Sequence, residues 1–217
     1  MPGFVPHTSL RLNLAMVGVF DGDSVRTYAR AFAPGGTFFF TVNLADRFAT
    51  LLTEHIDELR TSVRRVRDMH PFHIDAMVVL PEHLHAIWTL PVGDTDYPTR
   101  WALIKAGFSR RLAKVERISA SRSQKGERGI WQRRYWEHQI RNEDDYARHV
   151  DYIHYNPVKH GYVSAPRDWP HSSFHRFVRD GILPVDWGAN FVISETLHSG
   201  EPMRASPPAC DSLCFLD

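Results

Sequence analysis

The sequence predicts an α+β domain with a central, largely antiparallel sheet and helices packed on it. Strand-like and helix-like segments alternate along the chain in the order strand, helix, hairpin, helix, strand, helix. The chain has 217 residues, enough for one domain with a substantial core. Hydrophobic residues make up 43% of it and charged residues 24%, as in ordinary globular proteins.

The first half of the chain supplies a strand, a helix and a hairpin. Residues 37–44 are aromatic and β-branched, which favours a strand. Apolar residues then recur at helical spacing over 48–69, and Pro71 should end that helix. The segments 74–80 and 83–90 are strand-like and are separated by only two residues, so we expect them to pair as a hairpin.

The second half supplies a helix, a strand and a well-marked helix. The spacing of apolar residues predicts a helix over 100–114, and the aromatic segment 130–140 predicts a strand. A further helix is expected over 142–156. Asn142 is a favourable N-cap and acidic residues follow it. Pro157 should end this helix, because the residue before a proline is driven away from the α region.

These elements define one domain over residues 29–188, with a packing arm from about residue 160. Residues 1–28 show no sustained periodicity and are expected to be a poorly ordered extension, and 189–217 to be a tail. No internal repeat is found.

Cysteine usage and hydropathy limit the class of protein. The two cysteines, Cys210 and Cys214, exclude a disulfide framework or a four-cysteine zinc site, which favours a cytoplasmic location. No apolar run reaches the roughly 18 residues of a membrane span, so no membrane partner is expected. The apolar stretch 12–20 is short and lacks a cleavage site typical of a signal peptide.

A basic segment points to nucleic acid. Residues 100–141 contain twelve Lys or Arg and three acidic residues, although the whole chain has a net charge of only +1. Such a segment on an otherwise acidic protein is typical of polyanion binding, although a solvated loop is the usual alternative. Aromatic rings on which bases can stack are interleaved with these charges. They are Trp101, Phe108, Trp131, Tyr135 and Trp136.

His83 and His85 alternate along a predicted strand, so both imidazoles can face one metal ion. Imidazole suits Mn²⁺ or Zn²⁺ better than Mg²⁺, although Mg²⁺ can be recruited together with phosphate oxygens. The alternative is two histidines with ordinary structural partners. A nucleotide hydrolase of the histidine-triad kind is disfavoured, because Ile87 stands where a third alternate histidine is needed.

Tyr152 and Asn156 lie one turn apart on the predicted helix 142–156, on a flank shared with Asp145 and His149. A free phenol has a pKa near 10, so forming the phenolate at pH 7 costs about 4 kcal/mol. Nearby cations or a metal-bound phosphate can reduce that cost. A nucleophilic tyrosine therefore belongs beside a metal or a basic cluster, whereas an isolated tyrosine is more often a ring at the edge of the core.

Three stretches of the chain resemble the REP-associated tyrosine transposases, relatives of the single-tyrosine transposases in the HUH (His-hydrophobic-His) endonuclease superfamily. The stretches are LPEHLHAIW at 80–88, WQRRYWEH at 131–138 and HVDYIHYNPVKHG at 149–161. The resemblance extends from about Tyr28 to Trp187 and implies a ferredoxin-like HUH nuclease fold.

The resemblance also implies a site and a reaction. By this resemblance, His83 and His85 are expected to bind Mg²⁺ or Mn²⁺, and Tyr152 is expected to be the nucleophile. Asn156 is expected to be a third ligand, at a position where relatives often have Gln. The reaction would cleave and rejoin single-stranded DNA at REP-type hairpins through a 5′-phosphotyrosine intermediate. Basic residues expected to contact the DNA backbone are Arg110, Arg111, Lys114, Arg133 and Arg134.

Two other functions remain open. A hairpin-binding protein could keep this fold without cutting, and an RNA-processing protein would show a preference for the 2′-hydroxyl. Tyr28-Ala29-Arg30 stands where relatives often have Tyr followed by two basic residues, so recognition near the N-terminus is expected to differ. Cys210 and Cys214 are taken as incidental. We expect a monomer, since the arm after residue 160 can cover the surface that dimeric relatives use to exchange a helix.

Overall fold

The structure is a computed structural model that describes residues 33–114, 120–124 and 128–189. The predictions for residues 1–28, for Tyr28-Ala29-Arg30, and for Cys210 and Cys214 lie outside the described residues. So does the tail beyond residue 189.

A four-stranded antiparallel sheet forms the centre of the molecule, with the strand order β2-β3-β1-β4. The strands are β1 (Thr37–Asn43), β2 (His73–Val79), β3 (His83–Thr89) and β4 (Trp136–Gln139). β2 and β3 form the expected hairpin. With one helical segment between β1 and β2 and another between β3 and β4, this is the ferredoxin-like arrangement. The predicted α+β fold with an antiparallel sheet is therefore confirmed.

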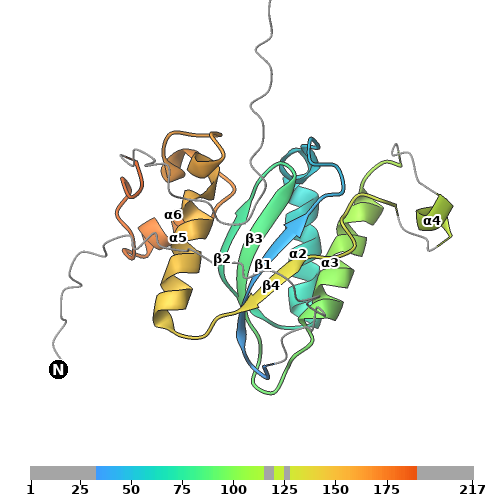
Figure 1. Cartoon of the computed structure of the whole chain (residues 1–217), viewed down its shortest axis with the longest axis horizontal. Helices are drawn as coiled ribbons and strands as arrows, with labels where there is room; N and C mark the ends of the chain where they lie inside the picture. Colours follow the sequence, from blue (N-terminus) through green and yellow to red (C-terminus); the bar gives the residue numbers. More distant parts are fainter. Residues whose placement is uncertain (1–32, 115–119, 125–127, 190–217) are drawn as a thin grey trace, which may run out of the picture.

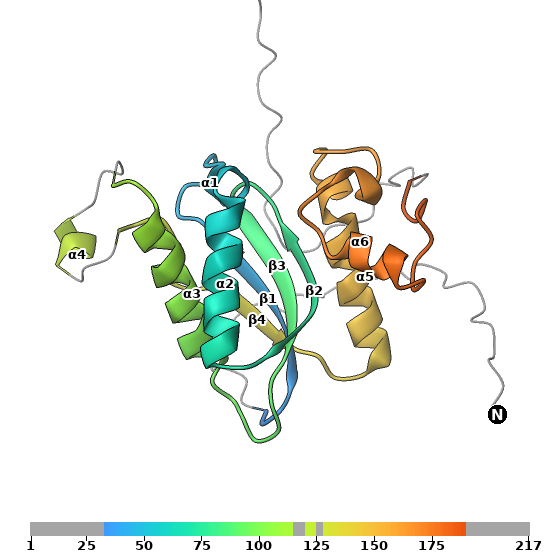
Figure 2. The ribbon, with the colours of Figure 1, turned by 180° about the vertical axis from the view of Figure 1, so that it is seen from behind.

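Helices cover both faces of the sheet. They are α1 (Leu51–Glu54), α2 (Ile56–Met69), α3 (Tyr97–Arg111), α4 (Ala120–Ser123), α5 (Glu143–Lys159) and α6 (Phe174–Arg179), with a 3₁₀ turn η1 (Pro166–Asp168). Figures 1 and 2 show α2 and α3 on one face and α5 and α6 on the other. The sheet is thus the middle of three layers, which buries both faces of its central strands.

The two helices predicted on the α2–α3 face have different bounds in the structure. The helix expected over 48–69 is interrupted at His55, whose non-helical backbone separates α1 from α2. The apolar spacing continues across this break, so periodicity could not reveal it. The helix expected over 100–114 begins earlier, because the Asp96 side chain caps it by accepting a hydrogen bond from the amide of Thr99.

The strand expected over 130–140 is much shorter, since β4 has only 4 residues. Trp131 instead makes an isolated bridge to Leu44, and the chain between Trp131 and β4 leaves the ladder. A continuous aromatic run does not by itself show where a strand pairs.

Helix α5 continues through the proline that was expected to end it. Pro157 lies inside the helix, which runs to Lys159. Because Pro157 has no backbone N–H, the helix lacks only one backbone hydrogen bond, and this bond would lie close to the helix end. The end is then closed by the His160 amide, which donates to the Asn156 carbonyl at 3.0 Å, and by Gly161 with a positive φ of 72°.

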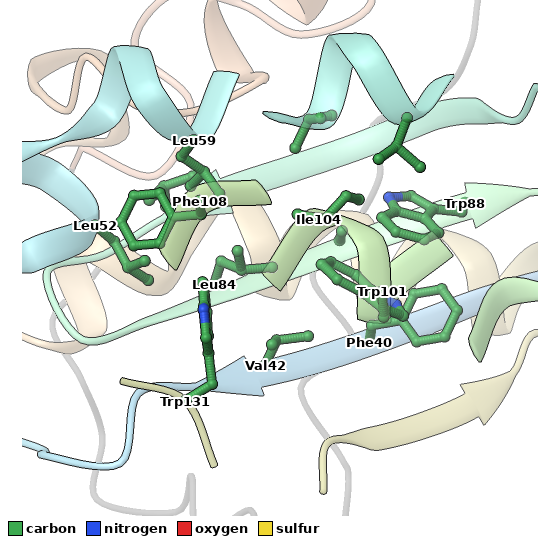
Figure 3. Close-up of a cluster of buried hydrophobic side chains, with 14 of the residues drawn as sticks. Phe40, Val42, Leu52, Leu59, Leu84, Trp88, Trp101, Ile104, Phe108 and Trp131 are labelled. Atoms are coloured by element: carbon green, nitrogen blue, oxygen red, sulfur yellow. The ribbon is translucent and has the colours of Figure 1, made fainter. Parts of the chain in front are cut away.

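The larger core lies between the sheet and the α2–α3 layer, and Figure 3 shows its side chains. Trp88 and Trp101 stack there with ring centroids 4.0 Å apart. A smaller core, which includes Phe39 and Ile87, lies on the α5 face. Because alternate strand residues point to opposite faces, His83 and His85 lie on the same side as Ile87. The candidate metal ligands therefore face α5.

Residues 161–189 pack against α5 and along the edge of β2. The Val79 amide donates to the His171 carbonyl at 2.9 Å, and the Ser173 amide donates to the Met77 carbonyl at 2.7 Å. These bonds satisfy backbone groups of an edge strand that would otherwise face solvent. Within the described residues, no helix is both long and apolar enough to cross a membrane.

Candidate active site and metal centre

The predicted ligands and nucleophile meet between β3 and α5. The His83 and His85 rings lie 4.9 Å apart between centroids, and the ring of Tyr152 lies 5.0 Å from that of His85. His160, the residue that follows α5, brings its ring to 5.1 Å from His83. Two imidazoles from the strand thus face a phenol and a third imidazole from the helix.

A second polar group fixes the orientation of each strand histidine. The Thr41 hydroxyl lies 2.9 Å from Nδ1 of His85, and the Glu82 carboxylate lies 3.3 Å from Nδ1 of His83. Glu82 is itself held by the Tyr162 hydroxyl, which donates to it at 3.2 Å. Metal-binding histidines characteristically make such a contact through the nitrogen that does not bind the ion.

The remaining nitrogens fit a metal ion. Nε2 of His83 and Nε2 of His85 are buried without a hydrogen-bond partner. An unsatisfied buried nitrogen is costly unless a ligand occupies it. Burial, followed by the nearby charge of His83, lowers the pKa of His85 well below its usual value. The neutral imidazole that results is the form that coordinates a metal.

Asn156 completes the set of possible ligands. It is fully buried, and neither its amide oxygen nor its amide nitrogen has a hydrogen-bond partner. It lies one helical turn after Tyr152 and one before His160, whose rings contact His85 and His83. A buried amide oxygen at this place can coordinate the same ion as the two imidazoles.

Tyr152 lies half-buried at the border of this site. Its ring packs edge-on against Phe39 at 5.9 Å, and the ammonium of Lys159 lies 4.9 Å above its ring centroid. Positive charge close to a phenol favours the phenolate, the form needed for nucleophilic attack.

Sequence reasoning did not assign a role to His160, Glu82 or Thr41. His160 continues the spacing of Tyr152 and Asn156, but the helix was expected to end before Pro157, so the spacing was not extended. The position of Glu82 next to His83 in the sequence could have indicated its role. Thr41 had none, because its contact depends on the pairing of β1 with β3.

A second cluster lies beside this site. It consists of His138, Asp145 and His149, whose potential ligand atoms all lie within 4.8 Å of one another. Nε2 of His138 lies 2.8 Å from the Asp145 carboxylate, and the His138 and His149 rings stack at 4.9 Å. The cluster could hold a metal ion, although in this structure the Asp145 carboxylate is hydrogen-bonded to His138, and Nδ1 of His149 is hydrogen-bonded to the Asp145 backbone carbonyl at 2.8 Å.

Several basic residues of the segment 100–141 are structural and not available to a polyanion. Arg100 is buried, and its guanidinium binds the Asp94 carboxylate at 2.6 Å. Arg128 donates to backbone carbonyls at the end of α3. Lys105 donates to the Gln132 carbonyl at 3.0 Å, and burial lowers its pKa to about 8.

The aromatic residues of this segment divide in the same way. Trp101, Phe108 and Trp131 are buried in the core and cannot stack on bases, so the expectation was wrong for them. Trp136 has 50% of its surface exposed. It lies opposite Thr41 in the β1–β4 pairing and its ring is 5.7 Å from Phe39, which places it beside the candidate site.

The basic residues expected to contact DNA are exposed, on the end of α3 and on the loop before β4. They are Arg110, Arg111, Lys114, Arg133 and Arg134. Arg111 makes a long ion pair with Glu58 at 3.7 Å, and Arg133 reaches the Ser121 hydroxyl at 3.4 Å. Their exposure is compatible with contacts to the DNA backbone.

Comparison with known proteins gives the family. No protein-family model matches the chain. It is 48% identical over 163 residues to the REP-associated tyrosine transposase of Escherichia coli K12, covering 75% of this chain and 91% of that protein. It is 47% identical over 164 residues to a Haemophilus influenzae protein of the same family name, covering 75% of this chain and 93% of that protein.

A solved structure agrees with this result. The structure of a REP-associated tyrosine transposase bound to a REP hairpin superposes with a TM-score of 0.69 at 45% identity. The match covers 83% of this chain and 100% of that one. With such identity over most of both chains, this protein belongs to the REP-associated tyrosine transposases.

Proposed function

We propose that this protein is a metal-dependent endonuclease and strand transferase of single-stranded DNA that acts at REP-type hairpins. One observation carries the proposal. Buried Nε2 atoms of His83 and His85 and the buried amide of Asn156, all without partners, lie next to the half-buried phenol of Tyr152. A protein that only bound hairpins would have no use for unsatisfied ligand atoms beside a tyrosine.

His83, His85 and Asn156 would hold the ion, Mg²⁺ or Mn²⁺. When bound, the ion supplies Lewis-acid polarisation of the scissile phosphate. Thr41 and Glu82 bind the two imidazoles through Nδ1, which leaves the buried Nε2 atoms for the ion. The positive charge of Lys159 beside the Tyr152 ring lowers the cost of the phenolate.

In the reaction, Oη of Tyr152 loses its proton and attacks the phosphorus. The bond between phosphorus and the 3′-oxygen breaks, and that oxygen takes up a proton. The products are a 5′-phosphotyrosine on the protein and a free 3′-hydroxyl on the DNA. Attack by a 3′-hydroxyl on the phosphotyrosine reverses the step, so the phosphodiester bond is conserved and no ATP is consumed.

The substrate follows from the family and from exposed charge. The solved relative is described as bound to a REP hairpin, and we extend that ligand class to this chain. The exposed residues Arg110, Arg111, Lys114, Arg133 and Arg134 are proposed to contact the DNA backbone.

We also propose that the protein works as a monomer. Tyr152 approaches His85 of its own chain, so one chain contains both the nucleophile and the strand ligands. Residues 161–189 of the same chain cover the outer side of α5. A stable dimer in light scattering would contradict this.

The deciding experiment is a denaturing gel of protein mixed with a labelled hairpin oligonucleotide carrying flanks from its own genome. Reactions contain Mn²⁺, Mg²⁺ or EDTA, with Tyr152→Phe as the matched variant. We expect label to migrate with the protein only when metal and Tyr152 are both present. Tyr155→Phe, a neighbouring tyrosine on the same helix, should still form the adduct.

The contrary result is equally clear. Tight hairpin binding with no adduct, across several flanks and both metals, would identify a non-catalytic hairpin-binding protein. Stronger binding of the RNA form of the same hairpin would indicate an RNA-processing protein.

A further inference from the structure

A groove with an arginine rim lies away from the candidate active site. It has a volume of about 380 Å³ and runs between α2 and the arm segment 170–176, along the edge strand β2. Its floor is apolar and includes Ile74, Met77 and Val79. This volume is at the small end of ligand sites, so it suits one or two nucleotides and not a duplex.

The rim carries four guanidinium groups and no carboxylate. Arg60, Arg64 and Arg67 follow one another at helical spacing on one side of α2. Arg64 and Arg67 are exposed and make no ion pair among the described residues. Arg60 pairs only with the exposed carboxylate of Asp57. Most of this positive charge is therefore available to an anion.

The fourth guanidinium is fixed in place. Arg176 on α6 donates to the backbone carbonyls of Ile74 and Asp75 in β2. Carbonyl oxygens orient a guanidinium without neutralising it. The arm that carries Arg176 is itself tied to β2 by the Ser173 hydroxyl, which accepts from the Met77 amide at 2.9 Å. The groove thus has a fixed charged wall opposite the arginines of α2.

The chemistry of the groove matches single-stranded nucleic acid. Guanidinium groups bind phosphate in a bidentate manner, and an apolar floor accepts the face of an unpaired base. The groove is also joined to the active site through β2. Val78 pairs with His85 in the sheet, whereas its neighbours Met77 and Val79 line the groove. A DNA strand that passes over the arm covering this edge could reach both places.

We propose that this groove binds an unpaired DNA segment extending from the hairpin, with phosphates on the arginines and a base on the apolar floor. The inference rests on the proposed function for the identity of the nucleic acid as DNA. An acidic peptide is the other ligand that such charge could attract, and the experiment below separates the two.

The test is binding in EDTA, where no cutting occurs, by fluorescence anisotropy. Two oligonucleotides are compared, namely a blunt hairpin and the same hairpin extended at both ends by unpaired thymidines. The variant is Arg64→Gln/Arg67→Gln. The matched control is Arg65→Gln/Arg179→Gln, which removes the same charge from exposed arginines outside the groove.

We expect the groove variant to bind the extended hairpin about tenfold more weakly and the blunt hairpin as well as wild type does. Loss of two phosphate contacts should lower the slope of log K against log salt by about 1.4. The control variant should affect the binding of the two oligonucleotides equally. Equal weakening of both oligonucleotides, or no weakening beyond the control, would overturn the proposal and leave an acidic peptide as the better ligand.

The two proposals fail in different ways. The groove variant should still form the covalent adduct at saturating DNA, whereas Tyr152→Phe should keep the preference for the extended hairpin. If wild type forms no adduct but the preference depends on Arg64 and Arg67, the groove stands and the chemistry is wrong. If the adduct forms but the preference is unchanged in the groove variant, the chemistry stands and the groove is wrong.

Discussion

The Thr41 hydroxyl on β1 lies 2.9 Å from Nδ1 of His85 on β3, directly across the ladder. This contact orients the imidazole, so that its buried Nε2 faces the site. Thr41→Val keeps the shape of the side chain but removes the hydroxyl. We expect Mn²⁺ affinity, measured by titration calorimetry, to fall by about 10- to 100-fold, as for other contacts that orient a metal ligand.

The same strand offers a control. Thr37 also lies on β1 and bonds the Thr89 hydroxyl at 2.8 Å, but it pairs at the far end of the strand from His85. Thr37→Val should leave Mn²⁺ affinity unchanged. If both variants lose affinity equally, the effect comes from the strand and not from orientation of His85.

Trp136 is expected to stack on a base of the DNA. Half of its surface is exposed, and it lies beside Phe39 at the border of the candidate site. Stacking of a base on an aromatic side chain contributes about 1–3 kcal/mol. Trp136→Ala should therefore weaken binding of the hairpin substrate in EDTA by roughly five- to 160-fold, measured by anisotropy.

Two variants separate stacking from general loss of apolar surface. Trp136→Phe keeps an aromatic face and should recover most of the affinity. Phe48→Ala removes a ring that is 90% exposed on the loop after β1 and should have no effect. Loss of affinity in Trp136→Phe as large as in Trp136→Ala would argue against stacking.

Arg100 is expected to contribute to stability and not to DNA binding. Its guanidinium binds both Asp94 carboxylate oxygens, and it also donates to the carbonyls of His70, Pro71 and Asp96. The compact ammonium of lysine cannot reach all these acceptors, so Arg100→Lys leaves several of them without their donor and leaves a buried cation with fewer partners. We expect the free energy of unfolding to fall by about 3 kcal/mol in urea denaturation.

Arg111→Lys is the comparison for this variant. Arg111 is exposed and its contact with Glu58 is 3.7 Å long, so its replacement should change stability by less than about 0.5 kcal/mol. If Arg100→Lys kept wild-type stability but bound DNA more weakly, Arg100 would instead belong to the surface that binds DNA.

The fold was largely predictable because its signals are local. The aromatic and β-branched residues of β1, the short connection between β2 and β3, and the N-cap of α5 are visible in short windows of sequence. The break at His55 and the passage of α5 through Pro157 were not, since both depend on tertiary packing that outweighs a local preference. The error at Pro157 also concealed His160, which lies one turn further along the same flank.

The site was predictable only where one element carries its residues. The spacing His83-Leu84-His85 and the interval from Tyr152 to Asn156 each belong to one strand or helix. Thr41 acts across a ladder, and the arginine groove joins α2 to residues about a hundred positions away. The local net charge overstated the surface available to DNA. Arg100 counts toward the basic segment, yet it is buried in an ion pair. A count of charges does not distinguish buried from exposed groups.

Asp151, the residue before the nucleophile, should make stability depend on pH. Burial raises the pKa of its carboxyl from 3.8 to about 6, and it has no hydrogen-bond or ion-pair partner among the described residues. Above pH 6 the folded protein holds a poorly hydrated carboxylate that the unfolded chain would hydrate freely. As pH falls through 6 towards 4, the folded state takes up the proton and this penalty disappears.

Asp151→Asn removes the charge at every pH. Because the group is partly exposed, we expect a gain of only about 1 kcal/mol in the free energy of unfolding at pH 7.5. The gain should vanish at pH 4, where the wild-type carboxyl is already protonated in the folded state. Asp144→Asn should act in the opposite direction, since a negative charge in the first turn of α5 favours the helix. A gain for Asp151→Asn that is equal at both pH values would show that desolvation of the carboxylate is not its cause.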